Sequence, residues 1–514
     1  MMQRRTFLAS LAAPAFVRAQ STNRAIIDTA RVKASLDRNL FGSFLEHLGR
    51  AIYQGVYEPG SPFADASGFR KDVMAEIKTL GVPIVRYPGG NFVSGYNWLD
   101  GVGPKNKRPR VHDRAWDSIE TNQFGTNEFI AWCRAAGTEP LMAVNLGWGT
   151  VEMAAAWVEY CNFDKGSKWS DLRREHGVAE PHEVRYWCLG NEMDGPWQIG
   201  HMTAREYGRK AVDAARQMRA TDRGLQLIAC GSSGPGMATF LEWDREVLEE
   251  CYQQVDALSL HRYYGNGANG ETKGDSHKYL AMNLDMEQQI DQVAATCDYV
   301  QKRLRSNKRL WLSFDEWNVW YRARGGRGNR QEAPHLLEEV YNLEDALLVG
   351  GLLNALLRRA DRVRVACLAQ LVNVIAPLMT NEKTVLRQTI YYPYAWALAH
   401  CRGQVLDLGV QSAEADGIAN VDVCATFDPA KREYAILLLN RHLANEPEVS
   451  LVFRDDAPSR TLGFDTLTGA DLKAANTFDA PNRVVPSKLE MPKAAARMTV
   501  KLPRQSYSIL RAAV

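Results

Sequence analysis

Short apolar runs and longer amphipathic stretches alternate along the chain from about residue 40 onward. The apolar runs are rich in β-branched residues, whereas the stretches between them carry apolar side chains at helical spacing. Such alternation is typical of repeated βα units. Eight runs predict strands, at residues 40–46, 83–86, 140–145, 184–190, 225–230, 257–261, 310–315 and 363–370. Eight parallel strands are the number that closes a (β/α)8 barrel.

The stretches between these runs predict helices. The segment 127–136 shows the pattern, because Phe129, Ile130, Cys133 and Ala136 recur on one helical face. An open doubly wound sheet would also produce this alternation, but it would gather its ligand-contacting residues at one switch point. Here polar residues follow nearly every predicted strand, which favours the barrel. The other predicted helices are residues 69–80, 204–220, 286–304 and 343–357.

The pattern changes after residue 391, where alternating strands are separated by Pro, Gly, Asn and Asp. This region predicts a β-sandwich, and the short strand-like segment 25–35 is expected to pair with it. Representative strands are 434–439, 449–453, 498–502 and 507–510. The chain therefore divides into a leader (1–19), an N-terminal strand segment (20–39), a barrel (40–390) and a β-sandwich (391–514).

The leader has the composition of a targeting segment. Arg4 and Arg5 precede an apolar run at 6–17, and Ala19 offers a cleavage site. This string resembles a twin-arginine export signal and predicts an exported protein, periplasmic or extracellular. A membrane anchor is disfavoured, because the run falls short of the roughly twenty apolar residues that span a bilayer.

Composition and charge exclude several function classes. Hydrophobic residues make up 46% and charged residues 24%, as in soluble globular proteins. Loss of the leader would remove three of the 62 basic residues and leave 59 against 60 acidic ones, so no basic excess favours nucleic acid or a membrane surface. The nine cysteines are scattered and never spaced C-x-x-C, which argues against a zinc site and a disulfide framework. We expect no metal and no cofactor.

Two glutamates follow strands on opposite sides of the predicted barrel mouth. Glu192 follows the fourth strand and Glu316 the seventh, so a glycosidic bond fits between them. Retaining glycosidases place such carboxyl groups about 5–5.5 Å apart. One glutamate alone would suit an exposed loop or a rim salt bridge. The pair, flanked by Asn191 and Trp317, predicts a retaining glycosidase.

The surroundings of the two glutamates suggest separate roles. A group that gives up and later takes a proton needs a raised pKa, a role that we assign to Glu192, while Glu316 stays ionised as the nucleophile. We expect His261 and Tyr263 to hydrogen-bond Glu316, and Arg86 to stabilise its negative charge. The alternative for His261 is a satisfied core histidine.

Other polar and aromatic residues at the strand ends are candidates for sugar binding. Carboxylate and amide groups bracket vicinal hydroxyls, which favours Glu46, Asn91 and Gln370 as hydroxyl readers. A turn residue is the alternative for Asn91, and a structural role the alternative for Glu46. The residues 265–270 match G-x-G-x-x-G, but no helix is predicted to open there, so we interpret 265–276 as a flexible rim loop. Candidate sugar platforms are Trp98, Trp197, Trp317 and Trp320.

Three strings, at residues 86–92, 187–198 and 370–377, resemble glycoside hydrolase family 51, the α-L-arabinofuranosidases of clan A. The resemblance implies that Glu192 is the acid/base and Glu316 the nucleophile of a retaining, exo-acting enzyme. Its substrates would be arabinoxylan, arabinan or their oligosaccharides. It also implies a barrel joined to a sandwich that the N-terminal strand enters. The arabinose subsite would contain Glu46, Arg86, Asn91, Asn191, His261, Tyr263 and Gln370.

The resemblance leaves other readings open. Family members are often cytoplasmic and often hexameric, so the predicted export signal departs from the family habit. Trp148 stands where a smaller residue is expected. Another clan A activity, β-xylosidase or endo-β-glucanase, would use the same two glutamates. A non-catalytic sugar-binding protein is a different class, which retention of both carboxylates disfavours.

Overall fold

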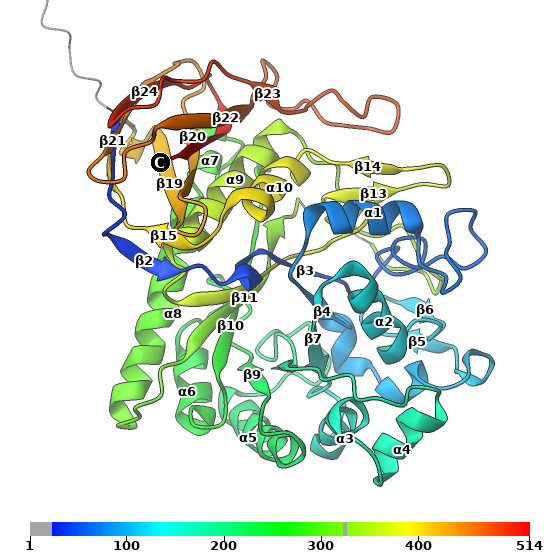
Figure 1. Ribbon diagram of the computed structural model, residues 1–514. Helices are drawn as coiled ribbons and strands as arrows, with labels where there is room; N and C mark the ends of the chain where they lie inside the picture. Colours follow the sequence, from blue (N-terminus) through cyan, green and yellow to red (C-terminus); the bar gives the residue numbers. More distant parts are fainter. Residues whose placement is uncertain (1–22, 322–325) are drawn as a thin grey trace, which may run out of the picture.

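The structure, a computed structural model, describes residues 23–321 and 326–514. Eight parallel strands form a closed barrel, and a two-sheet β-sandwich lies against it (Figure 1), as the sequence predicts. The predicted leader lies outside the described residues. The barrel strands are β3 (Gly42–Phe44), β4 (Ile84–Tyr87), β7 (Glu139–Val144), β8 (Tyr186–Leu189), β9 (Gln226–Ala229), β10 (Ala257–Tyr264), β11 (Trp311–Val319) and β12 (Val363–Leu368).

The barrel strands follow one another in chain order, and β12 closes on β3 through the pair Leu368 and Ser43. Helices cover their outer faces, so the strands are buried on both sides and read as continuous apolar runs. Two helices end at a left-handed glycine, Gly81 and Gly137, as the lack of a side chain permits. The helices are α1 (Lys71–Leu80), α2 (Thr126–Ala136), α3 (Val151–Asn162), α4 (Lys168–Glu175), α5 (Ala204–Thr221), α6 (Glu242–Cys251), α7 (Ser276–Leu280), α8 (Asn283–Arg303), α9 (Leu343–Arg358) and α10 (Tyr391–His400).

The strands β10 and β11 run further than the sequence predicts. They stay paired beyond the barrel wall, with His261 opposite Glu316 and Tyr263 opposite Asn318. The predicted strands end at residues 261 and 315, whereas the structure continues them to 264 and 319. The polar residues 262–263 and 316 therefore lie within strands instead of following them.

The sandwich takes one strand for each of its sheets from the N-terminal segment. Strand β1 (Asn23–Ile27) runs parallel to β21, and β2 (Val32–Ser35) runs antiparallel to β15, which confirms the expected pairing. The smaller sheet holds β16 (Gly409–Gln411), β1, β21 (Glu448–Phe453) and β24 (Arg497–Lys501). The larger holds β2, β15 (Gln404–Leu406), β19 (Val421–Asp428), β20 (Glu433–Asn440), β25 (Ser506–Ala513), β22 (Arg460–Leu467) and β23 (Ser487–Lys488).

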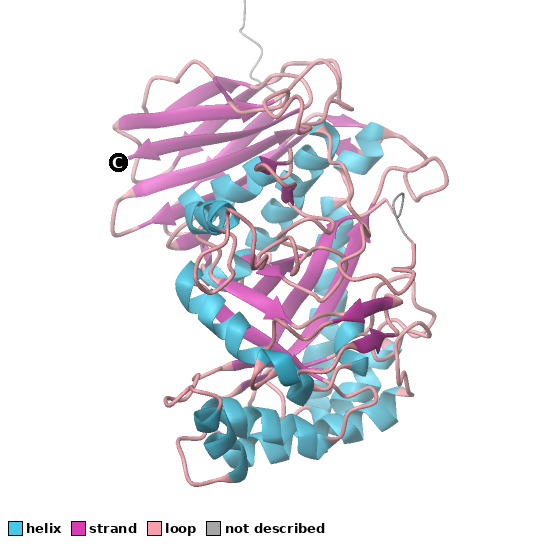
Figure 2. Cartoon of the chain, turned by 90° about the vertical axis from the view of Figure 1, so that its right-hand side faces the viewer, coloured by secondary structure: helices cyan, strands magenta, loops and turns pink. Residues whose placement is uncertain are grey.

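Helices join the sandwich to the barrel. The residues directly after 390 form helix α10, where the sequence suggests strands, and α10 packs against α9. Figure 2 shows the sandwich as a layer above these helices, with the barrel strands beyond them. One hydrophobic core runs from the barrel into the larger sheet, including Leu437 and Tyr507, and a second core fills the space between the two sheets.

Short hairpins decorate the barrel mouth and the sandwich: β5 (Val111–Asp113) with β6 (Ser118–Glu120), β13 (Leu378–Thr380) with β14 (Val385–Arg387), and β17 (Glu414–Ala415) with β18 (Ile418–Ala419). All nine cysteines are buried and free. Among the described residues, none of the helices has the length and apolar character that crossing a bilayer requires.

Candidate active site

A cavity of about 540 Å³ opens at the carboxyl ends of the barrel strands. Parallel strands bring their carboxyl ends to one face of a barrel, which is why residues far apart in the sequence meet here. Arg86 and Asn191 lie behind the cavity wall and bond to each other. The other seven residues predicted for the site line the cavity: Glu46, Asn91, Glu192, His261, Tyr263, Glu316 and Gln370.

Two hydrogen bonds, one from a guanidinium group and one from a phenol, fix the carboxylate of Glu316. Arg86 Nη1 donates to Oε1 at 2.6 Å, and the Tyr263 hydroxyl donates to Oε2 at 2.8 Å. Burial and the charge of Glu316 raise the pKa of Tyr263, so the phenol remains a donor. A Cβ atom on Gly90 would lie 2.9 Å from Oε1, so glycine lets this loop approach the carboxylate. The two bonds fix the orientation of the Glu316 carboxylate, which lines the cavity.

Glu192 has different surroundings. Its Oε1 lies 3.0 Å from His261 Nδ1, and its Oε2 accepts a 2.8 Å hydrogen bond from Trp197 Nε1. Burial raises the pKa of Glu192 and the charge of Glu316 adds to this, while the bonds from His261 and Trp197 act in the opposite direction. A carboxyl group with a raised pKa can donate its proton to a leaving oxygen.

The separation of the two carboxyl groups bears on stereochemistry. One side-chain ligand atom from each of Glu192, His261 and Glu316 lies within 4.8 Å of the other two. This spacing is close to the about 5–5.5 Å of retaining glycosidases and short of the about 6.5–9.5 Å of inverting ones. The same three groups have the makeup of a cation site, for which a protonated His261 would first have to give up a proton.

His261 is held in that protonated form. Burial lowers its pKa, but the charge of Glu316 and the bonds to Asp315 and Glu192 outweigh burial and raise the pKa to about 10. The sequence predicts a bond from His261 to Glu316. In the structure that distance is 3.7 Å, and the closer partner is Glu192. The imidazolium therefore lies between the two carboxyl groups.

Asp315 belongs to the site, although the sequence does not single it out. It is fully buried, with one oxygen 3.3 Å from His261 Nε2 and the other 3.3 Å from Arg86 Nε. The pairing of β11 with β12 is irregular between Phe314 and Trp317, which lets two successive acids face the same side. An acid within an apolar strand, next to the nucleophile candidate, is the signal that could have identified it.

Glu46 is a third buried carboxyl group. Its Oε1 accepts bonds from the Phe92 backbone N–H at 2.9 Å and from Trp116 Nε1 at 3.0 Å. Burial raises its pKa to about 8, with a contribution from the charge of Glu316. At neutral pH it is therefore a carboxylic acid, with one oxygen accepting and one able to donate. Its own backbone N–H donates to Gln370 Oε1 at 2.9 Å.

The aromatic candidates separate into two groups. Trp197 is 52% exposed and lines the cavity, and Trp320 also lines it, edge-on to Tyr263. Trp98 and Trp317 are buried, so the expectation that they bind a sugar ring is wrong. The sequence reasoning missed Trp116, Met237 and the loop 233–236, which complete the lining.

The rim loop is anchored, contrary to its interpretation as a flexible segment. Asn266 donates to both carboxylate oxygens of Glu344 at 3.1 Å and accepts a 2.7 Å bond from Thr272. Both Asn266 and Glu344 are buried. The loop thus connects the barrel mouth to the start of α9.

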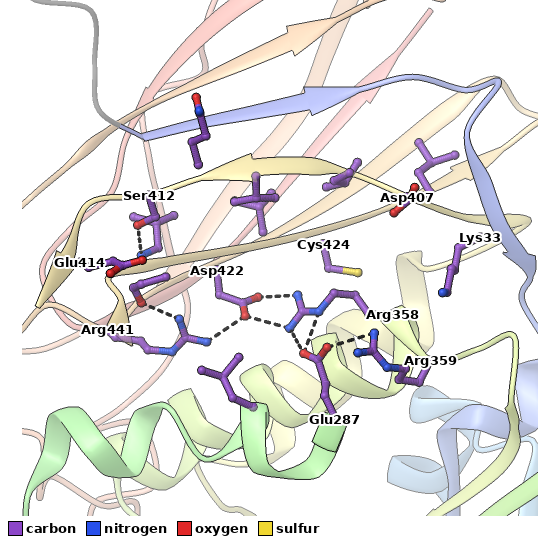
Figure 3. Close-up of a pocket in the computed structure, with 18 residues that line it drawn as sticks. Lys33, Glu287, Arg358, Arg359, Asp407, Ser412, Glu414, Asp422, Cys424 and Arg441 are labelled. Carbon is purple, nitrogen blue, oxygen red and sulfur yellow. Dashed lines mark hydrogen bonds and ion pairs between the residues drawn. The ribbon is translucent and has the colours of Figure 1, made fainter. Parts of the chain in front are cut away.

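A larger cavity, of about 800 Å³, lies where the sandwich meets α8 and α9 (Figure 3). Its central charges bind one another: Asp422 accepts from Arg358 and Arg441, and Glu287 accepts from Arg358. A network of this kind joins the sandwich to the barrel helices. The smaller cavity is the one that contains the candidate chemistry.

Comparison with known proteins identifies the family. Residues 76–283 match the model of the alpha-L-arabinofuranosidase 1 domain, and residues 315–506 match the alpha-L-arabinofuranosidase C-terminal domain. An intracellular exo-alpha-(1->5)-L-arabinofuranosidase of Bacillus subtilis is 46% identical, over 95% of this chain and 98% of its own. An exo-alpha-(1->6)-L-arabinofuranosidase of Bifidobacterium longum is 43% identical, over 90% and 91%.

Solved structures agree. A family 51 alpha-L-arabinofuranosidase from Bifidobacterium longum superposes with a TM-score of 0.90 at 39% identity, over 95% of this chain and 99% of that one. The Thermotoga maritima alpha-L-arabinofuranosidase, solved with arabinose, gives 0.85 at 32% identity, over 95% and 99%. A bifunctional glucanase-xylanase gives 0.57 at 12% identity and shares the fold alone.

The prediction of export is contradicted. Five of the relatives, including those of Bacillus subtilis and Streptomyces lividans, are named intracellular enzymes. That prediction depended on the first twenty residues, which lie outside both matched regions. With the matches spanning the barrel and the sandwich, the chain belongs to glycoside hydrolase family 51 and is an α-L-arabinofuranosidase.

Proposed function

We propose that this enzyme removes terminal α-L-arabinofuranosyl groups from arabinan- and arabinoxylan-type chains by double displacement, with Glu316 as nucleophile and Glu192 as acid/base. The observation that carries the proposal is the spacing of the two carboxyl groups, which bring one oxygen each to within 4.8 Å of one another. The Bacillus subtilis relative is named for α-(1→5) linkages, which supports short α-(1→5)-arabino-oligosaccharides as preferred substrates.

In the first step, Glu316 attacks the anomeric carbon while Glu192 protonates the glycosidic oxygen. The carbon–oxygen bond to the leaving chain breaks, and an arabinosyl ester of Glu316 forms. Arg86 and Tyr263 hold the attacking carboxylate, so little reorganisation is needed as the oxocarbenium-like transition state develops.

In the second step, Glu192 takes a proton from water, which attacks the same carbon and releases arabinose with its configuration retained. The change of role follows from electrostatics. The negative charge of Glu316 helps to raise the pKa of Glu192 in the free enzyme, and esterification removes that charge. The pKa of Glu192 then falls, which suits a general base.

The arabinosyl group itself would be held by the remaining cavity residues. Glu46, as a neutral acid, can donate to one hydroxyl and accept through its other oxygen. Asn91 and Gln370 supply amide groups on the same wall. A compact cavity with few platform aromatics supports exo action on a single terminal sugar rather than an open endo cleft.

Hydrolysis of two aryl glycosides tests the substrate assignment. We expect p-nitrophenyl α-L-arabinofuranoside to be cleaved at least a hundredfold faster, in kcat/KM, than the β-D-xylopyranoside, about 3 kcal/mol in transition-state binding. Proton NMR of the first products should show the α-anomer of arabinose before mutarotation. Faster xyloside cleavage would favour the β-xylosidase alternative, and β-arabinose as first product would exclude double displacement.

A homo-oligomer, which family membership suggests, is part of the same proposal. Light scattering of the purified chain should give a mass that is a multiple of 57.6 kDa. A monomer at assay concentration would contradict the proposed oligomer and would leave the proposed catalytic roles unchanged.

A further inference from the structure

Trp148 is an exposed aromatic residue that the chemistry at Glu192 and Glu316 leaves unexplained. It lies in the loop after β7, and 60% of its surface is accessible. A single exposed aromatic residue is common on protein surfaces, so the position of this one carries the inference. We propose that Trp148 forms a subsite for the leaving part of the substrate, the neutral arabino-oligosaccharide chain that remains after arabinose is removed. This inference rests on the proposed function and deepens it.

The loop that carries Trp148 packs against the loop of the acid/base. The Trp148 backbone N–H donates to the Ser94 carbonyl at 3.0 Å, and the Ser94 hydroxyl accepts from Gln198 at 2.5 Å. A Cβ atom on Gly147 would lie 2.4 Å from the Ile199 carbonyl, so the two loops are in close contact. Gln198 follows Trp197, the residue bonded to Glu192.

The position of this loop beside that of Glu192 indicates which part of the substrate would reach Trp148. Glu192 would protonate the leaving oxygen, so the leaving chain must pass the side of the cavity where Glu192 and Trp197 lie. Trp197 is half exposed and lines that side. Trp148, on the loop packed against that of Trp197, is a second indole that is more than half exposed. A chain that leaves the cavity past Trp197 would run toward this loop.

A second contact involves the indole ring itself. The Arg114 guanidinium lies 5.2 Å from the centre of the Trp148 ring, within range of a cation–π interaction. Arg114 belongs to the turn between β5 and β6, which Asp113 braces by accepting from the Trp116 backbone N–H. Trp116 in turn bonds Glu46 inside the cavity. Trp148 thus bridges two loops, each of which supplies a tryptophan to the cavity.

The space beside Trp148 suits a sugar unit. A hollow of about 400 Å³ has Trp148 in its wall together with the polar residues Asn97, Asn145 and Thr150. Aromatic faces stack on the apolar faces of sugar rings, while ring hydroxyls stay in water. The exposed Trp148 ring, at the edge of this hollow, offers such a surface.

Chain-length dependence tests the subsite. For the wild type we expect kcat/KM to rise from α-(1→5)-arabinobiose to arabinohexaose. In Trp148→Ala the hexaose-to-biose ratio should fall about tenfold, the loss expected for one stacking contact. Tyr299→Ala, which removes an equally exposed aromatic residue from α8, is the matched control and should keep the wild-type ratio. An unchanged ratio in Trp148→Ala would overturn the proposal, as would an equal loss on biose, hexaose and p-nitrophenyl arabinofuranoside.

Binding provides a readout that does not need turnover. In the Glu316→Ala background, calorimetry should show that Trp148→Ala weakens arabinohexaose about tenfold and arabinose by less than twofold. Equal Kd values for arabinohexaose with and without Trp148 would refute the subsite. If the wild type cleaved no arabinofuranoside while hexaose binding still depended on Trp148, the proposed function would fail and the subsite would stand.

Discussion

The Nδ1 atom of His261 lies 3.0 Å from Oε1 of Glu192, in a partly buried contact between a cation and the candidate acid. Each group changes the proton affinity of the other. The carboxylates around His261 raise its pKa to about 10, and His261 in turn opposes the rise that burial imposes on the pKa of Glu192. The pKa of the acid is therefore a balance between burial and this imidazolium.

Replacing His261 with alanine should disturb that balance in a defined direction. Without the imidazolium the pKa of Glu192 rises further, so the alkaline limb of kcat/KM should move to higher pH, and kcat/KM should fall by about 10²-fold. The measurement is a pH–rate profile with the aryl arabinofuranoside. Tyr263→Phe, which loses a bond to Glu316 and not to Glu192, should lower kcat/KM while its alkaline limb stays in place. A limb that moved to lower pH in His261→Ala would contradict this account.

The roles of the two glutamates can be separated by the stereochemistry of azide rescue. In Glu316→Ala, azide must attack the anomeric carbon directly, so the expected product is the β-arabinofuranosyl azide, of inverted configuration. In Glu192→Ala, azide replaces water in the second step and gives the α-azide. Each variant should lose about 10²–10⁴-fold in kcat/KM on oligosaccharides. NMR of the isolated azides decides the assignment, and the opposite pattern would exchange the two roles.

Much of this site is accessible from sequence because it follows from barrel geometry. Eight apolar runs give the strand order, and polar residues after parallel strands must gather at one face. Glu192 and Glu316 can therefore be paired from their positions along the chain. The bond partner of His261 cannot, because it depends on strands β10 and β11 continuing past the barrel wall with a bulge after Ser259.

Burial, too, does not follow from residue type. Trp317 and Trp197 have the same side chain, yet the first is fully buried and the second is half exposed. Trp116 enters the site through a hairpin turn whose position relative to Glu46 no periodic pattern encodes. Asp315 ends a predicted strand, but the irregular pairing of β11 that accompanies its inward position is not visible in the sequence.

Glu46 should control affinity for arabinose at alkaline pH. It is neutral below its pKa of about 8, and above it a second negative charge appears beside Glu316. The Kd for arabinose should therefore rise as pH passes through 8 in the wild type and stay flat in Glu46→Gln, which imitates the neutral acid. Titration calorimetry from pH 6 to 9.5 measures this. The same upward step in the variant would rule out Glu46 as its source.

Glu46 should also make the stability of the fold depend on pH, in the direction opposite to that of a carboxylate in an ordinary ion pair. Its pKa in the folded chain lies above the unfolded value, so stability falls as pH rises from about 4 and levels off above about 8. Glu46→Gln lacks this loss and should be more stable at pH 8 by roughly 1 to 3 kcal/mol. At pH 4 the two proteins should unfold at similar temperatures.

Asp422 should be a main support of the junction between sandwich and barrel. It lies on β19 and accepts bonds from Arg358 and Arg441 (Figure 3). It also accepts a bond from Asn354. Burial would raise its pKa, but the two guanidinium groups outweigh burial and lower it. Asp422→Ala leaves these cations buried with one carboxylate fewer, and should cost about 3–5 kcal/mol in denaturant unfolding at pH 7.

Acid pH should reduce the difference in stability between the wild type and Asp422→Ala. Because the folded pKa of Asp422 is lowered, its contribution is complete above the unfolded value of about 4 and is lost as pH falls through the folded pKa. The wild type should therefore approach Asp422→Ala in stability below pH 4. Asp291→Ala, which removes a 56% exposed partner of Arg359 at the same junction, should cost less than about 1 kcal/mol. Equal losses in the two variants at pH 7 would mean that burial of the charge network contributes little, and that apolar packing of α9 on the larger sheet holds the junction.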